Sequence, residues 1–112
     1  MTASPETPLS KSSRTTGREK PRVVGSYLDS DTLLLGKQLG AYVKHRRLAA
    51  GMSRTALTKQ TGVSASTIKW WEDDGYVISL PHLVVVSRYF NMTVYAFIYA
   101  AVQHWKENGH AT

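Results

Sequence analysis

Hydrophobic residues recur at helical spacing along most of the chain after residue 32. Leu35, Leu39 and Val43 stand four residues apart, with Lys37, Lys44 and Arg46 on other faces, which predicts a helix over about residues 33–50. Ser53 suits the cap of a short helix over 53–60, because its hydroxyl can accept a backbone N–H that lacks a helical partner. Ser64 offers a second cap of this kind, for a helix over 64–72.

Two more helices are predicted towards the C-terminus. Pro81 suits the first turn of a helix, where its missing N–H is not needed, and this favours a helix over 80–90 that ends at Asn91. The inner face of this helix is assigned to Leu80, Leu83, Val84, Ser87 and Phe90. Thr93 can cap a fifth helix whose apolar positions repeat until Gly109. Apart from a short "YVI" at 76–78, no stretch has the pattern of a strand, so the fold class is all-α, a five-helix bundle.

Composition divides the chain into three parts. Residues 1–30 are rich in Ser, Thr, Pro, Lys and Arg, and they bury too little apolar surface to offset the entropy of ordering. They therefore read as a disordered basic tail, which either touches DNA phosphates or only keeps the protein soluble. Residues 31–92 are predicted to form the core, and 93–112 a C-terminal helix.

The charge is positive and unevenly distributed. Fourteen Lys and Arg against eight Asp and Glu give a net charge of +6. Between residues 32 and 71 there are seven basic residues and no acidic one. A solvated helical surface usually mixes both signs, so this stretch favours nucleic acid or another anionic surface as a partner.

Several classes of site lack their residues. There is no cysteine, and therefore no disulfide framework and no thiolate metal site. The four histidines are scattered and form no HExxH-like pair: His45, His82, His104 and His110. The sequence also has no nucleophile elbow and no glycine-rich loop that could bind phosphate. We expect no enzyme activity, no metal and no cofactor. The longest apolar run, "VYAFIYAAV" at 94–102, is too short to span a bilayer, and without a visible secretion signal we expect a cytoplasmic protein.

Two short helices joined through a turn at Gly62 are the physical requirement for a helix-turn-helix, in which the first helix supports the second in a DNA groove. Here the chain resembles the Cro/lambda-repressor-like (XRE-type) helix-turn-helix family over about residues 35–98. The matching segments are "LGKQLGAYVKHRRLAAGMS" (35–53), "RTALTKQTGVSASTIKWWE" (54–72) and "LPHLVVVSRYFNMTVYAFI" (80–98). The signature positions hold Leu57, Gly62, Val63, Ile68, Trp71 and Glu72. The resemblance implies a lambda-repressor-like bundle and a bacterial or mobile-element regulator, more specifically a repressor, that binds double-stranded DNA.

Adjacent tryptophans within the third helix cannot share one narrow face, because neighbours on a helix point about 100° apart. Trp71 lies one turn after Ile68 and is assigned to the core. Trp70 is assigned to DNA, with packing on the second helix or on a partner subunit as the alternative. The resemblance, together with side-chain chemistry, assigns base reading to Ser64, Ala65, Ser66, Lys69 and Trp70. Phosphate contacts are assigned to Arg54, Thr67, Lys59 and Lys44.

A buried ion pair between Arg47 and Glu72 is also implied by the resemblance, as a structural element. Two positions depart from the family pattern. Thr58 replaces a small alanine where two helices touch, and "EDDG" at 72–75 is one residue longer than the usual Glu-X-Gly. The added negative charge either repels phosphate or shapes the loop.

The last helix carries more apolar surface than one small core requires, which favours an interface. We expect a homodimer on a pseudo-palindromic operator, because two-fold pairing doubles the DNA contacts. The interface is assigned to Tyr95, Phe97, Tyr99, Val102 and Trp105. The alternatives are a C-terminal helix that only packs on the core, and an antitoxin-type module that binds a partner toxin and regulates its own promoter.

Overall fold

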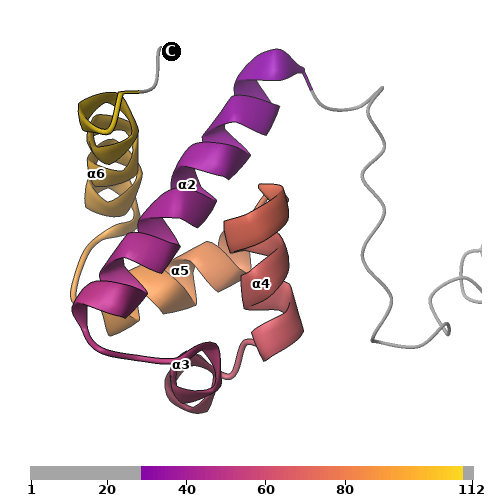
Figure 1. Ribbon diagram of the computed structural model, residues 1–112, viewed down its shortest axis with the longest axis vertical. Helices are drawn as coiled ribbons and strands as arrows, with labels where there is room; N and C mark the ends of the chain where they lie inside the picture. Colours follow the sequence, from indigo (N-terminus) through magenta and orange to yellow (C-terminus); the bar gives the residue numbers. More distant parts are fainter. Residues whose placement is uncertain (1–28, 110–112) are drawn as a thin grey trace, which may run out of the picture.

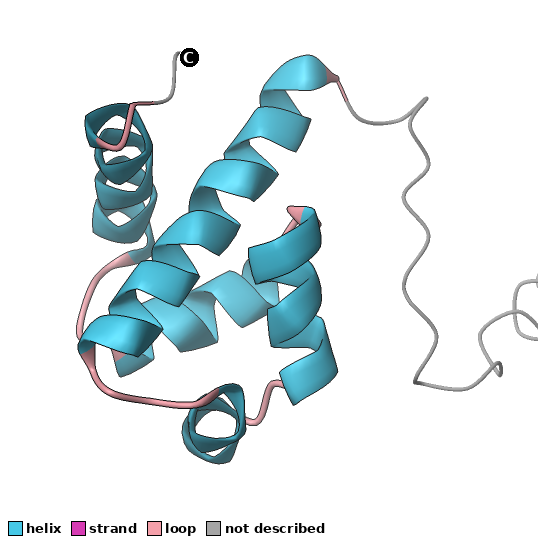
Figure 2. Ribbon diagram, in the orientation of Figure 1, coloured by secondary structure: helices cyan, strands magenta, loops and turns pink. Residues whose placement is uncertain are grey.

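The computed structural model describes residues 29–109, and within them it contains five helices and no strand (Figure 2). The all-α prediction is therefore confirmed. The predicted basic tail and His110 lie outside the described residues, apart from the last two positions assigned to the tail. The helices are α2 (Ser30–Ala49), α3 (Arg54–Thr61), α4 (Ala65–Asp74), α5 (Leu80–Tyr89) and α6 (Val94–Glu107).

Each helix begins at a side chain that accepts a hydrogen bond from a backbone N–H three residues later. Ser53, Ser64 and Thr93 accept these bonds at 3.0, 3.1 and 3.0 Å, so the three predicted caps are confirmed. Asp29 caps α2 at 2.9 Å and Ser79 caps α5 at 3.4 Å, two caps that the hydrophobic pattern did not indicate. The carboxylate of Asp29 is the reason why α2 starts three residues earlier than predicted.

The turns after α3 and α4 depend on left-handed glycines. Gly62 has a φ of 81° and Gly75 a φ of 68°, values that cost other residues steric energy. Helix α4 continues to Asp74, two residues past its predicted end, so the loop that follows begins at Gly75. Its "YVI" segment forms no strand; instead Ile78 enters the core.

Helix α2 runs through the middle of the bundle, with α6 along one side and α4 along the other (Figure 1). Helix α4 contributes Trp71 to the core, as predicted, and α6 contributes Phe97 and Ala101 to the same core. Leu80, assigned to the inner face of α5, is exposed, because it is the first residue of that helix and precedes the turn that packs. The core thus includes all five helices, and α6 is part of it.

Two glycines one turn apart let α4 approach α2 closely. A Cβ added at Gly40 would overlap the backbone carbonyl group of Trp71, and one added at Gly36 would lie 2.8 Å from the carbonyl oxygen of Gly75. The contact between these helices is therefore made by backbone atoms. The lack of side chains at these two positions therefore sets how closely α4 approaches α2.

No single helix among residues 29–109 is both long and apolar enough to cross a membrane. Helices α5 and α6 together meet a test of length and composition, but the chain bends by 86° between them. Both helices supply core residues, which accounts for their apolar content.

Candidate nucleic-acid interface

Helix α4 has one side in the core and one side facing out. Ile68 and Trp71 are buried, whereas Ser66 and Lys69 are exposed. Trp70 is half-buried, as are Ala65 and Thr67 near the start of the helix. The residues assigned to base reading therefore lie on accessible parts of α4 or beside them, and α3 supports this helix through the Gly62 turn.

The two hydroxyl groups at the start of α4 are engaged with one another. Ser64 Oγ accepts the backbone N–H of Thr67 at 3.1 Å and donates its own hydrogen to Thr67 Oγ1 at 2.8 Å. Ser64 is exposed, but its hydroxyl donor is directed along the helix. It therefore acts first as a cap: to donate to a base it would have to break the bond to Thr67 Oγ1, whereas its second lone pair can still accept a hydrogen bond.

On the inner side of α4, Glu72 forms a bidentate salt bridge with Arg47 of α2. Arg47 Nε and Nη2 donate to the two carboxylate oxygens of Glu72, each at 2.9 Å, and Arg47 Nη1 donates to the carbonyl oxygen of Met52 at 2.8 Å. The Glu72 side chain is 0% exposed and that of Arg47 is 7% exposed. The hydrogen bond to Glu72 raises the pKa of the Arg47 guanidinium above its ordinary value. The pair joins the end of α2 to α4.

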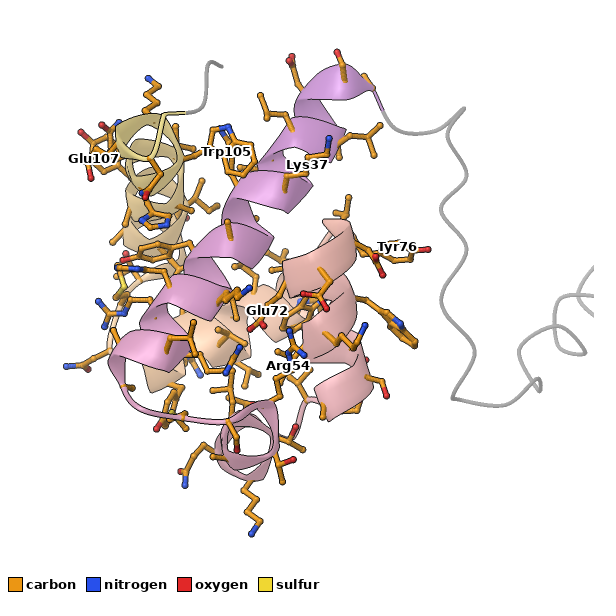
Figure 3. The ribbon with its side chains drawn as sticks, viewed as in Figure 1. Lys37, Arg54, Glu72, Tyr76, Trp105 and Glu107 are labelled. Atoms are coloured by element: carbon orange, nitrogen blue, oxygen red, sulfur yellow. The ribbon has the colours of Figure 1, made fainter. Side chains whose placement is uncertain are left out.

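Arg54, assigned to DNA phosphate, points towards the same carboxylate (Figure 3). Its Nε donates to Glu72 Oε1 at 3.0 Å and its Nη2 donates to Asp73 Oδ1 at 3.2 Å. No sequence pattern indicated this contact, because Arg54 and Glu72 are 18 residues apart and on different helices. In the free protein Arg54 is therefore a structural residue that ties α3 to α4.

The extra acid of "EDDG" lies within the last turn of α4. Asp73 Oδ2 is 3.3 Å from Lys69 Nζ, one helical turn away, so the carboxylate binds two basic side chains. The hydrogen bond from Lys69, with the charges of Arg54 and Lys44, holds the pKa of Asp73 below its ordinary value. Lys44 and Lys59 are exposed, as phosphate contacts require.

The residues assigned to a dimer interface separate into two groups. Tyr95 and Tyr99 are 84% and 68% exposed, and Val102 and Trp105 are half-buried. Phe97 is fully buried within its own chain, so its assignment to the interface is wrong. The hydrophobic pattern led to the wrong face because α6 is apolar on several faces. The Phe97 ring packs edge-on against Tyr42, with ring centroids 5.0 Å apart.

Three further observations concern polar groups. The buried hydroxyl of Thr58, one of the departures from the family pattern, has no hydrogen-bond partner among the described residues. Within residues 29–109, no three His, Asp or Glu side chains are grouped so that they can hold a metal ion. His45 and His104 lie with ring centroids 4.3 Å apart, between α2 and α6.

Comparison with known proteins identifies the family. A model of the helix-turn-helix domain matches residues 38–93, half of the 112-residue chain. The match runs from the middle of α2 through α3, α4 and α5, and so includes the charge-paired contacts described above. No curated protein and no solved structure matches the chain at a significant level. On its sequence and on the arrangement of α3 and α4, the chain belongs to the helix-turn-helix domain family of DNA-binding regulators.

Proposed function

We propose that this protein is a sequence-specific regulator that places α4 in the major groove of double-stranded DNA, and more specifically a repressor. The observation that carries the proposal is the outward side of α4, which offers hydroxyl, ammonium and indole groups while Arg47, Arg54 and Glu72 brace the helix from below. A rigidly held recognition helix loses little freedom when it binds. The sign of regulation is proposed from the resemblance to the Cro/lambda-repressor-like family, which implies a repressor.

Each proposed contact follows from side-chain chemistry. Lys69 is suited to guanine O6 and N7, Ser66 to either base or phosphate, and Ala65 to a thymine methyl group. Trp70 supplies a large apolar surface and one N–H donor. Phosphate contacts are proposed for Thr67, Lys44 and Lys59, and for Arg54 once a phosphate competes with Asp73.

Selection of bound duplexes from a random pool, at two salt concentrations, tests this function. We expect one enriched motif, with binding that weakens steeply as salt increases, because phosphate neutralisation releases counterions. A pool that stays random at both salt concentrations while the protein still retards DNA would mean non-specific binding. No retardation in dilute buffer would refute the proposed function.

Replacing Trp70 by alanine should change the enriched motif at one or two base positions, with little effect on the melting temperature. The reason is that Trp70 is only half-buried and lies on the side of α4 assigned to DNA. The same selection and a thermal melt provide both measurements. Tyr89→Ala, which removes an aromatic ring of comparable size from α5, is the matched control and should leave the motif unchanged. An unchanged motif with a lowered melting temperature would instead assign Trp70 to packing.

We further propose that the protein acts as a homodimer through the exposed side of α6. Tyr95 and Tyr99 lie one turn apart, and an apolar groove of about 470 Å³ opens beside Tyr95. The groove is lined by residues of α5, α6 and their connection, among them Leu80, Val84, Met92 and Val94. A second copy on this surface would present two recognition helices to half-sites roughly 34 Å apart.

Glutamate at both Tyr95 and Tyr99 should convert the dimer to a monomer and weaken operator binding by roughly tenfold or more, because the second half-site then loses its high effective concentration. Light scattering on a sizing column measures the mass, against 12.5 kDa for one chain. Leu48→Glu adds one negative charge, against two in the double variant, at an exposed apolar residue near the end of α2 and should leave the mass unchanged.

The same exposed tyrosines favour an antitoxin-type module as the second candidate function. A wild-type chain that is monomeric in light scattering would refute the homodimer. If that monomer forms a stoichiometric complex with a co-expressed protein, and Tyr95→Glu with Tyr99→Glu disrupts it, the antitoxin function would be supported instead.

A further inference from the structure

Asp73 lies on the same stripe of α4 as the residues proposed to read bases. Ser66, Lys69, Trp70 and Asp73 follow one another at helical spacings of three, one and three, which places them along one side of the helix. The Asp73 side chain is 34% exposed, and that of Lys69 is 57% exposed. A carboxylate is therefore displayed where the proposed function brings a polyanion.

This carboxylate pairs with two basic side chains that would otherwise be available to bind DNA phosphates. Oδ1 accepts from Arg54 Nη2 at 3.2 Å, and Oδ2 pairs with Lys69 Nζ at 3.3 Å, so each oxygen binds one basic side chain. Arg54 is on α3 and Lys69 on α4. The two helices of the helix-turn-helix thus share one counter-charge at their outer edge.

The stability of the fold gives little reason for an acid at this position. Asp73 is in the last turn of α4, where a negative charge opposes the helix dipole. Exposed ion pairs contribute little to the stability of a folded protein. Arg54 already has Glu72 as a buried partner. The location of Asp73 on the outward stripe therefore points to DNA binding.

We propose that Asp73 is a specificity-determining residue of the DNA-binding surface, which restrains Lys69 and Arg54 and lowers the affinity for duplexes other than the operator. The inference rests on the proposed function. Non-specific binding comes almost entirely from phosphate neutralisation, so a carboxylate that occupies two cations and repels phosphates weakens it. Base contacts suffer less, because a restrained Lys69 loses less side-chain freedom when it meets a guanine. The ratio of the affinity for the operator to the affinity for other duplexes rises as a result.

Asp73→Asn tests this inference in the full chain, with Asp74→Asn as the matched control. Both variants remove one negative charge at the end of α4, and Asp73→Asn removes the ion pairs to Lys69 and Arg54 on the outward stripe. Dissociation constants are measured for the selected duplex and for a scrambled duplex at four salt concentrations. We expect Asp73→Asn to bind the scrambled duplex at least about threefold more tightly, with a salt slope steeper by about 1, and the selected duplex to gain less. Melting temperatures of the three proteins should agree closely.

The outcomes separate this inference from the function on which it rests. If the wild type binds no duplex, the proposed function fails. If the wild type discriminates and Asp73→Asn discriminates equally well, or changes only as Asp74→Asn does, this inference alone is refuted. Loss of operator binding without a gain for the scrambled duplex would also refute it, since the carboxylate would then contact a base directly. Asp73→Ser, which also removes the charge, should repeat the result and covers a failure of the asparagine variant to fold.

Discussion

Replacing Gly40 by alanine should destabilise the protein by about 3 kcal/mol or more, the upper end of the cost of overpacking. The added methyl group would overlap the backbone carbonyl of Trp71, and backbone atoms cannot rotate away as a side chain can. Alanine normally strengthens a helix by about 1 kcal/mol relative to glycine, so the expected sign is opposite to that of helix propensity. Thermal unfolding measures the effect, which should exceed about 10 °C.

Gly36→Ala is the graded comparison for this prediction. Its new Cβ would lie 2.8 Å from the carbonyl oxygen of Gly75, at the end of α4, where the chain can shift more easily. We therefore expect a smaller loss of stability than at Gly40. If the Gly40→Ala variant melts at or above the wild-type temperature, α2 and α4 do not approach as closely as described.

Glu72→Ala should lower the free energy of unfolding by about 3–5 kcal/mol, because it leaves Arg47 buried without a counter-charge. The Glu72 carboxylate is fully buried and accepts hydrogen bonds from Arg47 and Arg54 at 2.9–3.0 Å, so its loss releases contacts that join three helices. Denaturant unfolding monitored by circular dichroism is the measurement.

Two further variants make this prediction specific. Asp74→Asn removes an exposed carboxylate only two residues away and should cost little. Arg47→Met combined with Glu72→Leu removes both charges of the buried pair and should recover part of the loss. A Glu72→Ala protein as stable as the wild type would show that the ion pair contributes no stability.

The parts of the fold that depend on local contacts could be predicted from the sequence. Ser53, Ser64 and Thr93 each accept a hydrogen bond from a residue only three positions away, so their type and place are sufficient to indicate a cap. Burial of Trp71 likewise followed from its spacing to Ile68 within one helix. Such features involve a single helix, whose geometry is known in advance.

Contacts between helices were predicted less completely. The bond from Arg54 to Glu72 joins residues on α3 and α4, and their separation depends on how these two helices pack rather than on the geometry of either helix alone. The assignment of Phe97 to an interface failed for a related reason. On a helix that is apolar on several faces, periodicity does not tell which face meets the core.

The burial of Phe97 and Ala101 also has a consequence for the limits of the protein's functional unit. The family match ends at residue 93, before α6 begins, yet these two side chains of α6 complete the interior beneath α2 and α5. The segment matched by the family model is thus smaller than the segment that forms one hydrophobic core. Any molecule that binds the outer side of α6 in the folded protein is thermodynamically coupled to α4, since it stabilises the core that both helices share by mass action.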